Sequence, residues 1–138
     1  MQDTEKEACL ILEEAAAALS LAYNLVKKEK VKQMIPAVQN ELSALRNEIN
    51  TNAHGFDPVR VSELVSKIDI KRDSPQPLTR LAANPGSATL QLACANVRHA
   101  VGKLHSSHPW ALNEIAFDSL NKLADVLYAL ARDEGSEL

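Results

Sequence analysis

Apolar residues recur at steps of three and four along most of this chain, which is the period of an α-helix. The clearest apolar row lies near the C-terminus and consists of Ala116, Leu120, Leu123, Leu127 and Leu130. Beside it runs a polar row with the same steps: Glu114, Asp118, Asn121, Asp125, Tyr128 and Arg132. Strand-like alternation of apolar and polar residues appears nowhere in the sequence. The pattern therefore predicts an all-α protein.

These rows, and the helix-breaking residues between them, predict five helices over about residues 4–30, 36–50, 57–70, 87–105 and 113–132. Pro36 is expected to open the second helix because proline suits the first helical turn, and Ser87 is expected to cap the fourth. The proline-rich segment 73–87 cannot form one regular element, and residues 133–138 are expected to fray. The expected architecture is a five-helix up-and-down bundle.

Composition narrows the class of protein. A length of 138 residues predicts one domain, with its core over about residues 5–132. The net charge of −3 gives no electrostatic case for binding nucleic acid. No apolar run approaches the roughly 20 residues that span a bilayer, and the acidic N-terminus does not resemble a signal peptide. We therefore expect a cytoplasmic protein without a membrane segment, with Cys9 and Cys94 as reduced core thiols.

Three stretches carry a resemblance to one family. Residues 120–132, LNKLADVLYALAR, are similar to a closing signature LNRLSDxLFxLAR. Asn84-Pro85-Gly86-Ser87 and the following Leu90-Gln91-Leu92-Ala93 stand where that family has FILPGG and LHLAR, and residues 12–22 resemble its first helix. In order and spacing, residues 8–132 thus resemble ATP:cob(I)alamin adenosyltransferases of the PduO type. The resemblance implies a ferritin-like, cobalamin adenosyltransferase-like bundle, and a homotrimer with active sites between subunits.

The same resemblance implies a reaction and its substrates. In the family, a Co(I) corrinoid attacks the 5′ carbon of ATP and displaces triphosphate, so ATP with magnesium and cobalamin would be bound if the activity is retained. The matching positions give five candidate ligand-binding residues and no assigned catalytic residue: Glu14, Arg98, Asn121, Lys122 and Asp125. Glu14 shares a helical row with Leu10, Ala17 and Leu21, and is expected to be semi-buried.

Several departures fall on the family's phosphate and corrinoid sites. The phosphate loop TRTGD has no counterpart, and residues 94–102 keep only Arg98 from the arginine-rich helix RTVCRRAER. Ala82 replaces the phenylalanine that helps to expel the lower ligand of cobalt, and Lys122 replaces an arginine. Asp125 is expected to face Cys94 and to lose its arginine partner. Each lost charge-assisted contact costs on the order of 1.5–3 kcal/mol, so ATP binding should be strongly weakened.

Three functions remain open. The first is a non-catalytic binding or assembly module on the adenosyltransferase scaffold, with a protein partner or another ligand. The second is a working adenosyltransferase in which Arg98, Asn121, Lys122 and Asp125 suffice, or which borrows a phosphate loop from a partner chain. The third is a helical scaffold unrelated to the family. A metal site is not expected, because the histidines at 99, 105 and 108 lack the i, i+4 spacing of a helical pair and no Glu-x-x-His motif occurs.

Overall fold

The computed structural model describes residues 3–51, 53, 55–68, 84–106 and 113–136. These residues form helices and no strand, in the order α1 (Asp3–Leu25), α2 (Glu29–Thr51), α3 (Val59–Ser66), α4 (Pro85–His105) and α5 (Glu114–Gly135). The predictions of an all-α class and of five helices are confirmed. The predicted third helix is shorter than expected, and its residues from 69 onward lie outside the described ranges.

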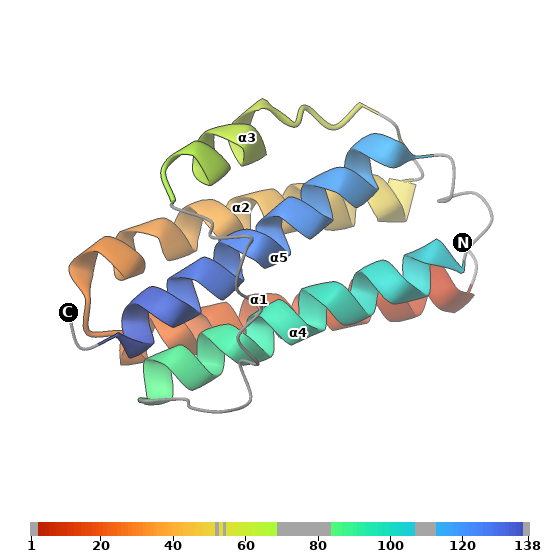
Figure 1. The fold of residues 1–138 in the computed structure, drawn as a ribbon. Coiled ribbons are helices and arrows are strands. Elements are labelled where there is room, and N and C mark those ends of the chain that lie inside the picture. Colours follow the sequence, from red (N-terminus) through yellow and green to blue (C-terminus); the bar gives the residue numbers. More distant parts are fainter. Residues whose placement is uncertain (1–2, 52, 54, 69–83, 107–112, 137–138) are drawn as a thin grey trace.

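Four long helices form the body of the bundle, and the short α3 lies on the outside next to α2 and α5 (Figure 1). The contact between α1 and α4 is the most extensive in the bundle, and the contact between α4 and α5 is the second most extensive. Alanines permit this close packing: Ala8, Ala15 and Ala22 of α1 and Ala93 and Ala100 of α4 are all fully buried. The leucines between them fill the core, which is shared by all five helices.

Helix α1 is long and apolar enough to cross a membrane by length and composition alone. Its inward side is packed against the other helices, with Leu12 and Leu19 buried. A core helix of a folded bundle passes the same test, so this feature is weak evidence for a membrane span.

The chain turns between α1 and α2 earlier than expected. Helix α1 ends at Leu25 and α2 begins at Glu29, so Pro36 lies inside α2 instead of opening it. An internal proline removes one backbone hydrogen bond and strains the preceding turn. Val31, Ile35 and Val38 are buried on both sides of the proline, and their packing keeps the helix continuous.

The start of α4 and the end of α5 differ from the prediction. Asn84, not Ser87, caps α4, because the Asn84 Oδ1 accepts a hydrogen bond from the Ser87 N–H at 2.8 Å. The Ser87 hydroxyl instead donates to the Ala131 carbonyl at 2.8 Å. Helix α5 continues to Gly135, so residues 133–135 are helical where fraying was expected. Residues 73–83, including Ala82, and His108 lie outside the described part of the chain.

Candidate functional site

Helices α4 and α5 bring three of the polar side chains together. The Arg98 Nη2 lies 3.7 Å from the Asp125 Oδ1, and both side chains are about half exposed. The Arg98 guanidinium carbon lies 5.9 Å from the centre of the Tyr128 ring, within the range of a cation–π contact. Because Asp125 and Tyr128 are one turn apart on α5, a single arginine reaches both. The predicted polar stripe of α5 therefore borders α4 at the surface.

Two other candidates occupy the neighbouring turn of α5. The Lys122 Nζ forms an ion pair with the Asp118 Oδ2 at 2.8 Å, in the favourable i, i+4 arrangement. Asn121 is exposed. We call Arg98, Asn121, Lys122, Asp125 and Tyr128 the α4–α5 polar cluster. Its two cations each lie beside an aspartate: Arg98 beside Asp125 within the cluster, and Lys122 beside Asp118 just outside it, so each positive charge has a negative partner.

The expectation that Glu14 is semi-buried is wrong. Glu14 is exposed, and so are Leu10 and Leu21 in the same row of α1, by 58% and 54%. The buried faces of α1 are formed by two other rows, which point toward α2, α4 and the core. Glu14 has no ion pair with any residue that the structure describes, and it does not join the α4–α5 polar cluster. Its neighbour Glu13 contacts Arg46 of α2 at 2.6 Å.

The expectation that Asp125 lacks a partner is also wrong. The Cys94 thiol does lie at this position of the α4–α5 contact, where it donates a hydrogen bond to the Ala124 carbonyl at 3.3 Å. Arg98 follows one helical turn later on the same side of α4, and its long side chain reaches Asp125 instead. The carboxylate thus keeps a guanidinium partner, supplied from a different turn of the helix.

Both cysteines are free and buried, as predicted. Burial raises the pKa of the Cys94 thiol above its ordinary value of 9.0; Arg98 lowers it and Asp125 raises it, and burial is the largest cause. Burial also raises the pKa of Cys9, against a lowering by Arg46. Both thiols therefore stay protonated near neutral pH, and neither has the environment of a reactive nucleophile.

A raised thiol pKa predicts a pH-dependent stability. The folded state holds the Cys94 proton more tightly than the unfolded chain, so its contribution is complete below the unfolded pKa and is lost as pH rises through the folded pKa. Above about pH 9, Cys94 should lower the unfolding free energy of the wild type by up to about 1.4 kcal/mol per pH unit. Cys94→Ala should lack this component. Urea unfolding of both proteins from about pH 8 to 10 measures it, and parallel pH profiles would contradict it.

A second group of polar residues was not foreseen. Glu41 and Glu48 of α2 are both buried, although most buried positions of this helix are apolar. They stand seven positions apart, directly beside Leu42 and Ile49 of the predicted core row. That spacing places both carboxylates on one side of α2. Their position beside the core row could have indicated from the sequence that both are buried. Among the described residues, no three His, Cys, Asp or Glu side chains are grouped so as to hold a metal ion.

Comparison with known proteins bears directly on the scaffold. The model of one protein family, described as cobalamin adenosyltransferase, matches residues 4–134. No curated protein matches the sequence. The matched region includes all of α2, α3, α4 and the α4–α5 polar cluster, and nearly all of α1 and α5. The chain belongs to the cobalamin adenosyltransferase family.

Proposed function

We propose that this protein is a diverged member of the family that has lost ATP-dependent transfer and acts as a non-catalytic binding or assembly module. The observation that carries the proposal is the charge pairing in the α4–α5 polar cluster. Arg98 lies beside Asp125, and Lys122 beside Asp118. Both cations are thereby partly neutralised, at a place where a triphosphate would need concentrated positive charge.

The cost of placing ATP there follows from electrostatics. A triphosphate carries three to four negative charges, and bidentate arginine contacts are its strongest protein partners. To bind Arg98 and Lys122, the phosphates would have to displace two aspartates that stay close by. Like charges left in proximity oppose binding, so this cluster favours partners other than a bare polyphosphate.

The alternative is a working adenosyltransferase that moves the 5′-deoxyadenosyl group of ATP to a Co(I) corrinoid. One observation favours it: Arg98 retains a carboxylate partner in Asp125 and contacts Tyr128, an ordered arrangement at the place that the resemblance assigns to the site. In this alternative, ATP with magnesium and cobalamin are the substrates, and Arg98 and Lys122 must exchange their aspartates for phosphate. Arg98 is thus the residue that separates the two functions.

We further propose self-association, as a homotrimer, in the cytoplasm. Leu10 and Leu21 of α1 and Leu92 of α4 are 58%, 54% and 54% exposed. The Lys103–Glu7 ion pair crosses between α4 and α1 at 2.9 Å. Leu92 stands three turns before Lys103 on one side of α4, and Leu10 one turn after Glu7, so these leucines border the same outer side of the α1–α4 contact. A second copy or another protein would cover apolar surface there.

The deciding experiment is a calorimetric titration of the purified protein with ATP and magnesium, and then with cobalamin. We expect no saturable ATP binding in the micromolar range, and Arg98→Ala should change neither this result nor the oligomeric mass measured by light scattering. Micromolar ATP binding by the wild type that Arg98→Ala abolishes would overturn the proposal and favour the alternative, which an assay of adenosyl transfer to a Co(I) corrinoid then tests. The conservative Arg98→Lys variant then shows whether charge alone suffices or the guanidinium fork is needed.

A further inference from the structure

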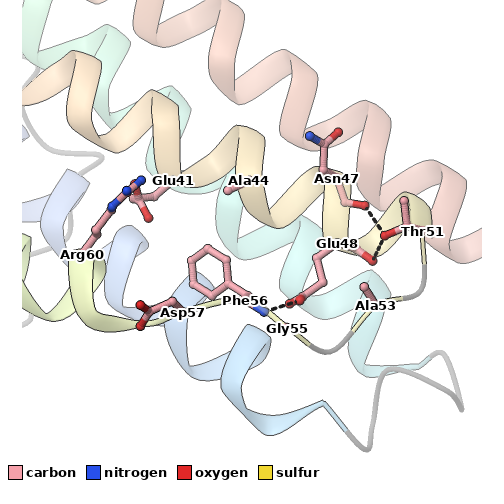
Figure 2. A pocket seen from close by; sticks show the side chains of 10 residues that line it. All are labelled: Glu41, Ala44, Asn47, Glu48, Thr51, Ala53, Gly55, Phe56, Asp57 and Arg60. Carbon is pink, nitrogen blue, oxygen red and sulfur yellow. Dashed lines mark hydrogen bonds between the residues drawn. The ribbon is translucent and has the colours of Figure 1, made fainter.

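A pocket lies between residues 37–41 of α2 and residues 60–67 in and just after α3. Its volume is about 330 Å³, which is within the range of small-molecule sites. Ala37 and Leu64 give it apolar surface, Asn40 is also part of its wall, and the four remaining lining residues are charged: Glu41, Arg60, Glu63 and Lys67. We call it the Glu41 pocket. Glu41 and Arg60 also border a larger pocket beside it, which Figure 2 draws.

Glu41 is a buried carboxylate without a partner in the part of the chain that the structure describes. It is only 6% exposed, and it takes part in none of the ion pairs or side-chain hydrogen bonds of the described residues. Figure 2 shows its side chain on the side of α2 that faces α3. Unlike the Glu48 Oε2, which is sealed from solvent, the Glu41 oxygens are accessible, so a molecule in the pocket can reach them. A buried carboxylate without a donor costs free energy, which a positively charged donor in the pocket would recover.

The opposite wall of the Glu41 pocket supplies positive charge. Arg60 of α3 and Lys67, the C-cap of that helix, are exposed, and neither forms an ion pair with a carboxylate among the described residues. Arg60 extends from α3 toward the level of Glu41 in Figure 2, yet the two side chains are not in ion-pair contact. With Glu63, the pocket wall carries two anions and two cations. Its charges are therefore balanced but unpaired, with a recessed acceptor on α2 and donors on the α3 side.

Balanced, unpaired charges favour a ligand that itself carries both charges. A simple cation held by Glu41 would also meet the positive charges of Arg60 and Lys67, and a simple anion held by Arg60 would meet Glu41. A zwitterion avoids both conflicts, because its ammonium group donates to the protein carboxylate and its own carboxylate accepts from the guanidinium. Ala37 and Leu64 provide apolar contact for a hydrocarbon side chain. The pocket thus has the features of a site for a small amino acid.

We propose that the Glu41 pocket binds an aliphatic α-amino acid as its zwitterion. Glu41 accepts the ammonium group, Arg60 together with Lys67 binds the carboxylate, and Ala37 and Leu64 contact the side chain. Binding is non-covalent and supplies the donor that Glu41 lacks within the described chain. None of these residues belongs to the α4–α5 polar cluster, so the site is separate from the proposed function and stands whether or not adenosyl transfer occurs.

The test is a calorimetric titration of the whole protein with L-leucine at about 0.15 M ionic strength. We expect saturable binding, which Glu41→Gln weakens by about tenfold or more because it removes the charge-assisted contact to the ammonium group. Arg60→Gln should weaken binding by about threefold or more, a smaller effect since Lys67 still binds the carboxylate. Glu48→Gln is the matched control, because it removes the same charge from another buried position of α2 that does not line this pocket. It should leave the affinity within about twofold.

Two analogues of leucine test the ligand without any change in the protein. 3-Methylbutylamine lacks the carboxylate and 4-methylpentanoate lacks the ammonium group, and each should bind at least about tenfold more weakly than leucine. These titrations keep the test valid if Glu41→Gln does not fold. Absence of saturable leucine binding, an affinity that Glu41→Gln leaves unchanged, or an affinity for either analogue equal to that for leucine would each overturn the proposal.

Discussion

Gly86→Val should lower the unfolding free energy by about 3 kcal/mol. Gly86 lies in the first turn of α4, where this helix meets the chain leaving α1. A Cβ atom at position 86 would come within 2.9 Å of the Val26 Cα, which is closer than Cβ atoms approach other atoms in proteins. The obstacle is main chain, so no side-chain rotation relieves it. Chemical denaturation measured by circular dichroism gives the change.

Gly102 provides the matched control on the same helix. Nothing lies within 4 Å of a Cβ built at position 102. Gly102→Val should therefore change stability by less than about 0.5 kcal/mol, because valine and glycine differ little in helix propensity. Equal losses in the two variants would mean that the close approach of α4 to Val26 does not limit stability.

The sequence predicted the helices of this fold well, but it predicted their ends poorly. The three- and four-residue steps of apolar positions identified all five helices, because each helix buries at least one row. Helix ends were less predictable, since they depend on tertiary packing. Pro36 favours a helix start by its own conformational preference, yet burial of Val31 and Ile35 extends α2 backward past it. The sequence of residues 29–36 does not show which side chains of the other helices will bury Val31 and Ile35.

The candidate site, too, could be predicted only in part from the sequence. The polar row on α5 was visible from the sequence, and so was Arg98 as the retained guanidinium. Which turn of α4 meets Asp125 depends on the axial offset of the two helices, which spacing within one helix does not fix. The prediction for Glu14 was wrong for a related reason. Its row on α1 contains Leu10 and Leu21, but both leucines are exposed. Row composition alone does not distinguish a core face from an exposed apolar one.

We expect the second large loss of stability from a substitution at the C-terminal end of α5. Glu134→Ala should lower the unfolding free energy by about 3 kcal/mol. Glu134 is only 2% exposed, and its two carboxylate oxygens accept hydrogen bonds from the Lys27 N–H at 2.8 Å and the Lys28 N–H at 3.1 Å. These donors lie just before α2, where an anion is also favoured by the helix dipole. Alanine would leave both donors without their acceptor.

Two variants separate this role from a general effect of charge at the chain end. Asp133→Ala removes the neighbouring carboxylate, which is half exposed and only 3.9 Å from Arg132, and should cost less than about 0.5 kcal/mol. Glu134→Gln keeps one acceptor oxygen and should show an intermediate loss in urea denaturation. If Glu134→Ala proved as mild as Asp133→Ala, the carboxylate would not be what joins the end of α5 to the α1–α2 turn. A large loss, in contrast, would mean that truncating the chain before residue 134 weakens the contact between α5 and the start of α2, although the sequence there reads as a frayed tail.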